Sequence, residues 1–243
     1  MVRERSGSTG ASARVPTREV VLAAVRLFTE GGFEPTTMDD IAAATGVSRR
    51  SLFRRFGSKE DILFAEHDEL FASVSRHLEA DSGEPLDVVF AAARLVLQGY
   101  LSDPEITVPR YHLVRAHPRL RDREVAMTAR YQAAFSRYLA AREGEGGPEE
   151  RSLAAGVTAA ALISAHNHVL RSWLRHPGQE TREVWARYDS AMEFVRRAAG
   201  PMLHPADDPV RDRVVVAVYP ADLGREELLR RLSAAVDGAV PRH

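Results

Sequence analysis

The segment between Thr37 and Lys59 constrains the fold of this chain more than any other, because it predicts two short helices joined by a tight turn. Thr37 can cap the first helix through its hydroxyl, and Asp40, three residues later, completes a box-like cap. Gly46 can adopt the positive φ that ends this helix, and Val47 can hold the corner that follows. The spacing therefore predicts a helix-turn-helix unit.

The second helix of this unit is predicted to run from a Ser48 cap to Phe56. Leu52 and Phe56 are four positions apart, so both can face inward beside the corner of the turn. The same helix carries the arginines Arg49, Arg50, Arg54 and Arg55. On a helical wheel centred on Leu52, the side chains that point most directly outward are those of Arg50, Phe53 and Arg54.

Arginines clustered on one short helix predict a surface that binds nucleic acid. Each guanidinium presents paired N–H donors that match guanine O6 and N7 or phosphate oxygens, and residues near the start of a recognition helix meet base edges. A merely solvated face is the alternative, because the chain contains 33 lysines and arginines in all. The series of cap, glycine turn and second cap favours DNA binding.

Residues from about 14 to 63 resemble the N-terminal domain of the tetracycline-repressor (TetR) family of bacterial transcription regulators. The matching positions are Thr36-Thr37, Ile41-Ala42, Gly46-Val47-Ser48, Leu52-Phe53, Phe56 and Ser58-Lys59-Glu60. The resemblance implies a homodimer that binds a palindromic operator in double-stranded DNA. It also implies an unknown small-molecule effector and a repressor that responds to it.

The resemblance further implies which side chains contact DNA. Phosphates would be contacted by Thr37, Phe53 and Lys59, and bases would be approached by Arg49, Arg50, Ser51 and Arg55. Arg54 joins this set because of the wheel geometry more than because of the family pattern. The family usually has tyrosine at position 53, so Phe53 keeps the apolar contact but lacks the phenolic hydrogen bond to phosphate.

Charge is unevenly distributed along the chain. Residues 1–60 hold ten basic and seven acidic residues, which leaves 23 basic and 27 acidic residues in the remainder. The positive field therefore coincides with the helix-turn-helix, as expected for a DNA-binding end.

Length and composition predict a cytoplasmic protein with one small and one larger domain. The 243 residues suffice for two buried cores, and the absence of cysteine excludes a disulfide scaffold. The N-terminus lacks the apolar core of a signal peptide, and no stretch approaches about 18 uninterrupted apolar residues. We therefore expect neither secretion nor a membrane partner.

Helical periodicity with Gly and Pro breaks predicts an all-α fold. We expect a disordered arm over 1–13, a three-helix DNA-binding head over 14–63, a helical effector-binding and dimerisation body over 64–200, and a C-terminal extension over 201–243. A first helix is predicted over 17–30 and a long one over 59–80, followed by body helices near 86–101, 105–117, 119–142, 149–175 and 180–198.

Small side chains in the predicted helix 149–175 would let another helix approach closely. They are Ala154, Ala155, Gly156, Ala159, Ala160, Ala161 and Ser164. The predicted helix 180–198 carries an apolar stripe consisting of Val184, Tyr188, Ala191, Met192 and Val195. Two such helices from each subunit predict a four-helix dimer interface. Packing within one chain is the alternative.

Large body residues that could line an effector pocket are Tyr111, Met127, Tyr131, Phe135 and Trp173, with His112, His166 or Arg110 as polar anchors. From these we predict Tyr111, Met127, Tyr131, His166 and Trp173 as ligand-binding residues. The spacing of Met127, Tyr131 and Phe135 is equally typical of a core stripe. His166 and His168 point in nearly opposite directions on a helix, which argues against a metal site.

The sequence indicates neither an enzyme nor a cofactor. It contains no phosphate-binding glycine loop and no Gly-x-Ser-x-Gly elbow, and no carboxylates or histidines stand at a recognised catalytic spacing. The alternative to a regulator is an all-α small-molecule-binding or enzymatic protein whose DNA-binding head is inactive.

The tail contains a β-branched run over 214–219, which predicts one strand, followed by a helix from Asp222 to Val236. A single strand needs a partner for its backbone groups. Pairing with the same strand of the other subunit and docking as a non-strand extension both remain open.

Overall fold

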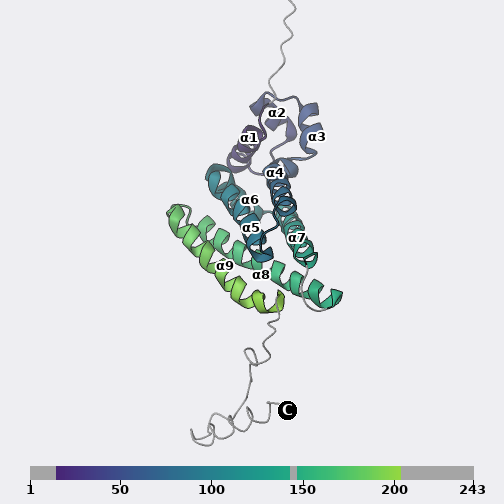
Figure 1. The fold of residues 1–243 in the computed structure, drawn as a ribbon. Helices are drawn as coiled ribbons and strands as arrows, with labels where there is room; N and C mark the ends of the chain where they lie inside the picture. The colour runs from purple at the N-terminus through teal and green to yellow at the C-terminus, as the bar shows by residue number, and fades with distance from the viewer. Residues whose placement is uncertain (1–14, 143–146, 204–243) are drawn as a thin grey trace, which may run out of the picture. The chain divides into compact units, whose positions relative to one another are not determined.

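The computed structural model describes residues 15–142 and 147–203, and these residues fall in one compact unit. Within them the chain forms nine helices and no strand, which confirms the all-α prediction (Figure 1). The helices are α1 (Thr17–Glu30), α2 (Met38–Thr45), α3 (Arg49–Phe56), α4 (Lys59–Ala80), α5 (Pro85–Ser102), α6 (Pro104–Ala116), α7 (Pro118–Ala140), α8 (Pro148–Arg175) and α9 (Thr181–Leu203). The predicted arm over 1–13 and the predicted strand over 214–219 lie outside the described residues.

Proline marks the start of four consecutive body helices. Pro85, Pro104, Pro118 and Pro148 each occupy the first turn of α5, α6, α7 or α8. Proline suits this position because its fixed φ is already helical and the missing N–H would have no partner there. The predicted body helices therefore begin within a residue or so of the observed ones. The helix predicted over 180–198 extends further than expected, since α9 continues to Leu203.

The helix-turn-helix forms as the capping residues predict. The Thr37 hydroxyl accepts the Asp40 amide at 3.2 Å, and the Asp40 carboxylate accepts the Thr37 amide at 2.8 Å. Gly46 ends α2 at φ +66°, in the left-handed region that glycine tolerates best. The Ser48 hydroxyl then accepts the Ser51 amide at 3.3 Å and caps α3. These local contacts determine where α2 ends and where α3 begins.

The core of the head is completed by helices from the body. Apolar side chains of α1, α2, α3 and α4 pack together around Phe28, Ile41 and Leu52, all of which are buried. The same cluster includes side chains contributed by α6 and α7: Ile106, Leu113, Val114 and Leu120. The head therefore depends on body residues for its own burial.

Helix α4 runs without a break from Lys59 to Ala80, so the domain boundary predicted at residue 63 falls inside it. It packs against α1 and α3 of the head and against α5 and α7 of the body. Arg123 and Arg130 on α7 form ion pairs with Asp61 and Asp68 on α4, and the second pair measures 2.8 Å. This single helix therefore contacts both the DNA-binding end and the body.

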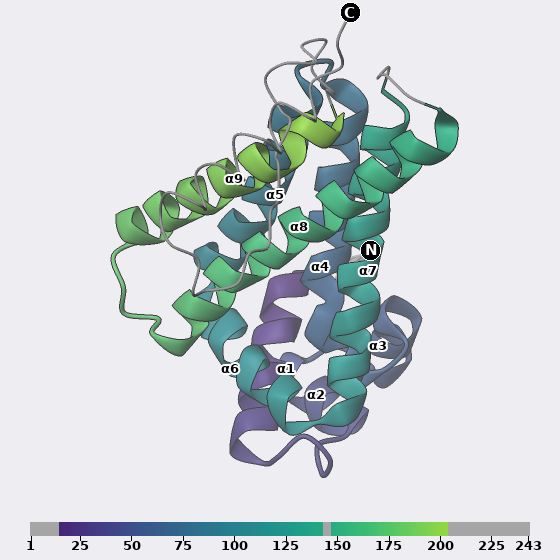
Figure 2. The ribbon, with the colours of Figure 1, turned by 90° about the horizontal axis from the view of Figure 1, so that it is seen from below.

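Helices α8 and α9 lie side by side at the end of the described unit opposite to α1–α3 (Figures 1 and 2). The predicted α9 stripe faces the core of its own chain, because Val184, Tyr188, Met192 and Val195 are all buried within the monomer. Ala155 and Ala159 of α8 are buried in the same cluster. The stripe thus packs within its own chain, as the alternative interpretation held, and a dimer interface formed by α8 and α9 stays a prediction.

Helix α8 is also long and apolar enough to cross a bilayer by length and composition. It packs against α7 and α9, and its buried residues include Leu162, Val169 and Trp173. A core helix of a helical bundle passes the same test, so this apolarity is explained by packing within the fold.

Candidate functional site

Helix α3 exposes a cationic surface. Arg50 and Arg54 are exposed and form no hydrogen bond or ion pair with any described residue. Phe53 lies between them in the sequence and has 42% of its surface exposed, an unusual value for a large apolar side chain. The three residues that the helical wheel directs outward are thus the three that the fold leaves available for a partner.

Arg49 and Thr37 border this surface. The Arg49 guanidinium forms an ion pair with Asp39 of α2 at 2.8 Å and lies 5.4 Å from the centre of the Phe53 ring. Both partners of the ion pair are well exposed, so the pair is weak and can open for an anion. Thr37 is exposed at the start of α2, and Ser51 is half-buried beside the α3 cap.

Arg55 turns away from this surface. Its guanidinium donates to the Val15 carbonyl and to the Thr17 hydroxyl, both at 2.6 Å, and it lies 4.7 Å from the Phe56 ring centre. These contacts hold the start of α1 against α3. The proposed approach of Arg55 to bases remains a prediction, and the fold assigns this side chain an additional structural role.

Lys59 is likewise occupied inside the head. Its ammonium donates to the carbonyls of Phe33, Glu34 and Thr36 at 2.6, 3.1 and 3.1 Å. It also lies 4.5 Å from the centre of the Phe33 ring, a distance typical of a cation–π contact. Lys59 therefore ties the loop between α1 and α2 to the start of α4. Sequence reasoning missed this role, because loop carbonyls leave no pattern in side chains.

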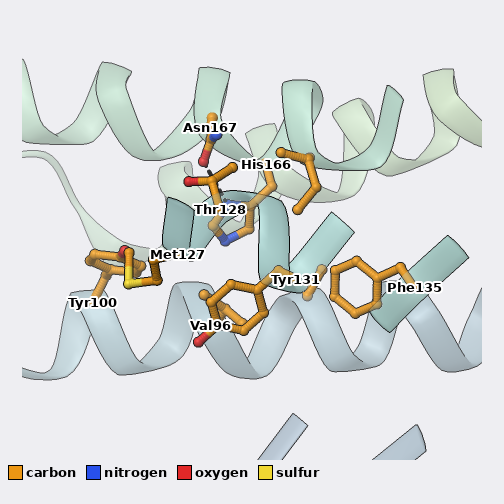
Figure 3. Close-up of a pocket in the computed structure, with 10 residues that line it drawn as sticks. Val96, Tyr100, Met127, Thr128, Tyr131, Phe135, His166 and Asn167 are labelled. Atoms are coloured by element: carbon orange, nitrogen blue, oxygen red, sulfur yellow. Dashed lines mark hydrogen bonds between the residues drawn. The ribbon is translucent and has the colours of Figure 1, made fainter. Parts of the chain in front are cut away.

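A second candidate site is a small pocket between α5, α7 and α8, with a cavity volume of about 30 Å³ (Figure 3). Its lining residues are Ala93, Val96, Tyr100, Met127, Thr128, Tyr131, Phe135, Ile163, His166 and Asn167. The structure thus brings together three predicted ligand-binding residues, Met127, Tyr131 and His166. The lining contains no Asp, Glu, Lys or Arg, and its one titratable imidazole, His166, can be neutral.

The two other predicted ligand-binding residues do not line this pocket. Trp173 is buried in the body core near the end of α8, and Tyr111 on α6 packs against His112 and Arg115. Both were selected because they are large and aromatic, a property that core packing requires equally. A role of Tyr111 and Trp173 in ligand binding stays a prediction that this pocket does not support.

Tyr100, Thr128 and Asn167 line the pocket although sequence reasoning did not select them. Thr128 had a usable signal, because it lies three residues before Tyr131 and thus on the same face of α7. Tyr100 and Asn167 had none, since their positions depend on how α5 and α8 cross.

His166 is the buried polar group of the pocket. Burial lowers its pKa to about 4, a shift opposed by the hydrogen bond with Asn167, so the imidazole is neutral at pH 7. Its Nδ1 lies 3.4 Å from Asn167 Oδ1, while its Nε2 is buried and has no hydrogen-bond partner among the described residues. Figure 3 shows the ring projecting from α8 toward Val96 and Tyr131.

The pocket adjoins α4. The Tyr131 hydroxyl donates to the His67 carbonyl at 3.4 Å, and the Tyr100 ring lies 5.1 Å from the His67 ring. Burial lowers the pKa of His67 well below its usual value, and the nearby Arg110 guanidinium lowers it further, so this histidine is also neutral. Two pocket residues therefore touch the helix that begins directly after α3.

Arg110, considered above as a polar anchor, is buried outside the pocket lining. Its guanidinium lies 3.7 Å from the Glu66 carboxylate and 5.5 Å from the Tyr100 ring centre. Burial raises the pKa of Glu66, and the charge of Arg110 opposes that rise. The buried guanidinium of Arg110 thus already forms an ion pair with a carboxylate of α4.

The outer face of α8 exposes apolar and small side chains. Leu153 and Val157 are 68% and 43% exposed, and Ala160 and Ser164 continue the same helical face. The neighbouring α9 exposes Phe194 to 66%. We call these five residues the α8–α9 apolar patch. Exposed apolar side chains on two helices that pack together are typical of an interaction site.

Two family profiles match the chain. One, described as "Bacterial regulatory proteins, tetR family", matches residues 20–65, which contain the helix-turn-helix. The other, described as "MftR C-terminal domain", matches residues 83–197, which cover α5 to most of α9. The two matches together span both the cationic surface and the pocket.

Relatives of known description agree with these matches. The transcriptional regulator TcmR of Streptomyces glaucescens is 28% identical over 190 residues, which cover 73% of this chain and 81% of TcmR. A protein described as a mycofactocin biosynthesis transcriptional regulator, MftR, of Mycobacterium tuberculosis is 30% identical over 125 residues. That match covers 50% of this chain and 62% of the relative, which is less than two thirds of its length.

A solved structure shares the fold. A TetR-family transcriptional regulator from Syntrophomonas wolfei superposes with a TM-score of 0.55 at 16% identity, and the match covers 76% of this chain and 94% of that one. At such low identity the similarity concerns the arrangement of helices, and the function rests on the family matches and on the two sites described above.

Proposed function

Because the chain belongs to the TetR family and is a DNA-binding transcriptional regulator, we propose that it represses transcription as a homodimer on a palindromic operator. Operator binding would be relieved by a small molecule in the pocket between α5, α7 and α8. The protein would act in the cytoplasm, where it meets the bacterial chromosome. No catalytic step is needed for this activity.

The observation that carries the proposal is the exposed face of α3. Arg50 and Arg54 stand free of partners among the described residues, with Phe53 between them in the sequence and Arg49 beside them. A short helix of this kind fits the major groove, where an arginine can form two hydrogen bonds to one guanine. Arg50, near the start of α3, is our choice for the main base contact.

Dimerisation is proposed through the α8–α9 apolar patch. A second copy would cover Leu153, Val157 and Phe194, which are the largest exposed apolar side chains of these two helices. Ala160 and Ser164 would let the facing helix approach closely because their side chains are short. A two-fold dimer would have to present its two α3 helices on one side of the assembly, because two half-sites lie about 34–36 Å apart.

The effector would act through α4 and through the apolar cluster of the head. Tyr100 and Tyr131 line the pocket and also contact His67 of α4, so a ligand that moves either ring biases the position of that helix. Met127 of α7 lines the pocket and also packs against the apolar cluster of the head, which supplies a second route. The ligand shifts the equilibrium toward a head spacing that fits the operator poorly, by the ratio of its affinities for the two states.

The proposal is tested by a gel shift with the full chain and DNA from the region upstream of its own gene, followed by selection of binding sites from random DNA. We expect a palindromic site. Arg50→Ala should lose discrimination at one base pair of each half-site, at a cost of about 1–3 kcal/mol.

Arg137→Ala is the matched control, because Arg137 is exposed on α7, far along the chain from α3. It should leave the selected site unchanged. If the wild-type chain selects no sequence, the alternative of a small-molecule-binding protein with an inactive head gains support. If Arg50→Ala selects the same site with the same preference, the base contact lies elsewhere on α3.

A further inference from the structure

Nε2 of His166 is a buried polar atom without a partner among the described residues, and it belongs to a residue that lines the only apolar pocket described above. We propose that the effector of this pocket is an uncharged aromatic molecule whose hydroxyl group donates a hydrogen bond to His166 Nε2. This inference rests on the proposed effector-dependent function and names the chemistry of the effector.

The acceptor character of Nε2 follows from the contact on the other side of the ring. Asn167 Oδ1 can only accept, so His166 Nδ1 carries the hydrogen and donates across the 3.4 Å between them. A neutral imidazole with its hydrogen on Nδ1 leaves a lone pair on Nε2. His166 is 5% exposed and Nε2 itself is buried, so solvent does not satisfy that lone pair, and a ligand hydroxyl would supply the missing hydrogen bond.

A charged ligand is disfavoured by the pocket lining. None of the ten lining residues is an aspartate, glutamate, lysine or arginine. A carboxylate placed here would lose its hydration without gaining an ion pair, which is far more costly than burying a hydroxyl. Arg110 does not offset this cost, because it lies outside the lining and is matched by Glu66 at 3.7 Å.

The aromatic character follows from the remaining lining. Tyr131 and Phe135 form successive aromatic contacts along α7, with ring centres 6.5 Å apart, and Tyr100 is a third lining ring. Edge and face contacts with such rings favour a flat ligand, and the Met127 thioether adapts to its outline. The cavity itself holds only about 30 Å³, so we expect a small molecule of a single ring, admitted as the lining side chains move apart.

Three single-ring probes separate the possible chemistries in calorimetric titrations of the full chain without DNA. Phenol has a ring and a donor, anisole has nearly the same ring shape without a donor, and benzoate carries a negative charge. One satisfied hydrogen bond predicts that phenol binds about tenfold more tightly than anisole, and that benzoate binds more weakly than both. Equal binding of phenol and anisole, or a preference for benzoate, would overturn the proposal.

Two variants assign the effect to one atom. His166→Phe keeps a ring of similar size but removes Nε2, so phenol and anisole should then bind with equal affinity. His112→Phe is the control, since His112 is exposed on α6 and does not line the pocket. It should retain the tenfold preference. A preference for phenol that persists in His166→Phe would assign the donor to another acceptor and contradict the proposal.

A measurement on the wild-type chain covers the case in which His166→Phe does not fold. The nitrogen NMR resonance of unprotonated Nε2 should shift when phenol is added and stay in place when anisole is added. Operator binding without any probe tests the regulatory function separately. A chain that binds its operator but shows no phenol preference contradicts only the effector chemistry, whereas a phenol-binding chain that binds no operator contradicts the regulatory function.

Discussion

Two cations of the head, Lys59 and Arg55, hold the fold together from within. Each was expected at the DNA because it stands on or beside the recognition helix, yet each donates to backbone carbonyls of the α1 region or its following loop. A lysine ammonium with three protein acceptors has no donor left over for a phosphate. Arg50 and Arg54 are thus the cations with the clearest access to DNA.

Lys59→Ala should therefore destabilise the protein. Hydrogen bonds from a charged donor contribute about 1.5–3 kcal/mol each in favourable cases, so we expect the free energy of unfolding in urea to fall by roughly 1–3 kcal/mol. Arg54→Ala, which removes an exposed cation from the same region, should leave it nearly unchanged. If Lys59→Ala instead keeps full stability and lowers the salt dependence of DNA binding by about one unit, the phosphate contact is the main role.

The buried histidine of the pocket predicts a pH dependence of stability. The pKa of His166 is about 4 in the folded chain and near its usual 6.5 in the unfolded chain, so between these values only the unfolded state takes up the proton. The free energy of unfolding should thus fall as the pH falls below about 6.5, by up to about 1.4 kcal/mol per pH unit for this group. His166→Phe should show a shallower loss in denaturant titrations from pH 7 to pH 5. Parallel curves for the two proteins would place the acid sensitivity in other groups, His67 among them.

Single residues were predictable wherever a local contact decides their role. The caps at Thr37 and Ser48 and the left-handed Gly46 follow from the neighbouring sequence, and all three are confirmed. Asn167 and Tyr100 could not be placed in the pocket, because their neighbours come from helices distant in the chain. The inward turn of Arg55 was missed for the same reason, since Val15 and Thr17 lie about 40 residues away.

At the scale of helices, periodicity located the elements but did not decide what each apolar face contacts. The α9 stripe is equally suited to its own core and to a second subunit, and the structure uses it for the core. The outer face of α8 was harder to recognise. Leu153 and Val157 fit the apolar pattern of a core helix, and only their exposure in the fold shows that they face outward. Exposure depends on the tertiary fold, which periodicity does not contain.

Val157→Arg should give a monomer. The substitution would bury an unpaired guanidinium at the centre of the α8–α9 apolar patch in a dimer, at a cost of several kcal/mol, while the side chain stays solvated in the monomer. Sedimentation should show the change in mass, and operator affinity should fall with it. Val125→Arg is the control, because Val125 is 68% exposed on α7 and lies outside the patch. An intact Val157→Arg dimer would move the interface to another surface.

At the scale of the whole chain, the head and the body share one apolar cluster. Residues of α6 and α7 are buried among those of α1, α2 and α4, so the predicted boundary at residue 63 separates side chains that pack together. Sequence similarity located the helix-turn-helix, because its features are local. It could not show that the head is completed by residues more than 40 positions further along, since such packing has no local signature.

Ile106→Ala should loosen the head although Ile106 belongs to a body helix. The side chain is fully buried in the shared cluster, and its truncation should cost about 2–5 kcal/mol. Amide exchange should accelerate in α1 and α2. Leu162→Ala, a truncation in the separate body cluster, should accelerate exchange mainly in α7 to α9. Exchange in α1 and α2 that is untouched by Ile106→Ala would show that the head is independent of α6.

The shared cluster also determines how this protein can be re-engineered. A sensor is often built by joining the DNA-binding end of one regulator to the ligand-binding end of another, with the cut placed between them in the sequence. Here such a cut would leave Ile106, Leu113 and Val114 facing foreign side chains. Promoter specificity is better changed by editing the exposed face of α3 alone, because Arg50, Phe53 and Arg54 take no part in that cluster. The exposed surface of α3 can therefore be exchanged on its own, whereas exchanging the whole DNA-binding domain would disturb the shared cluster.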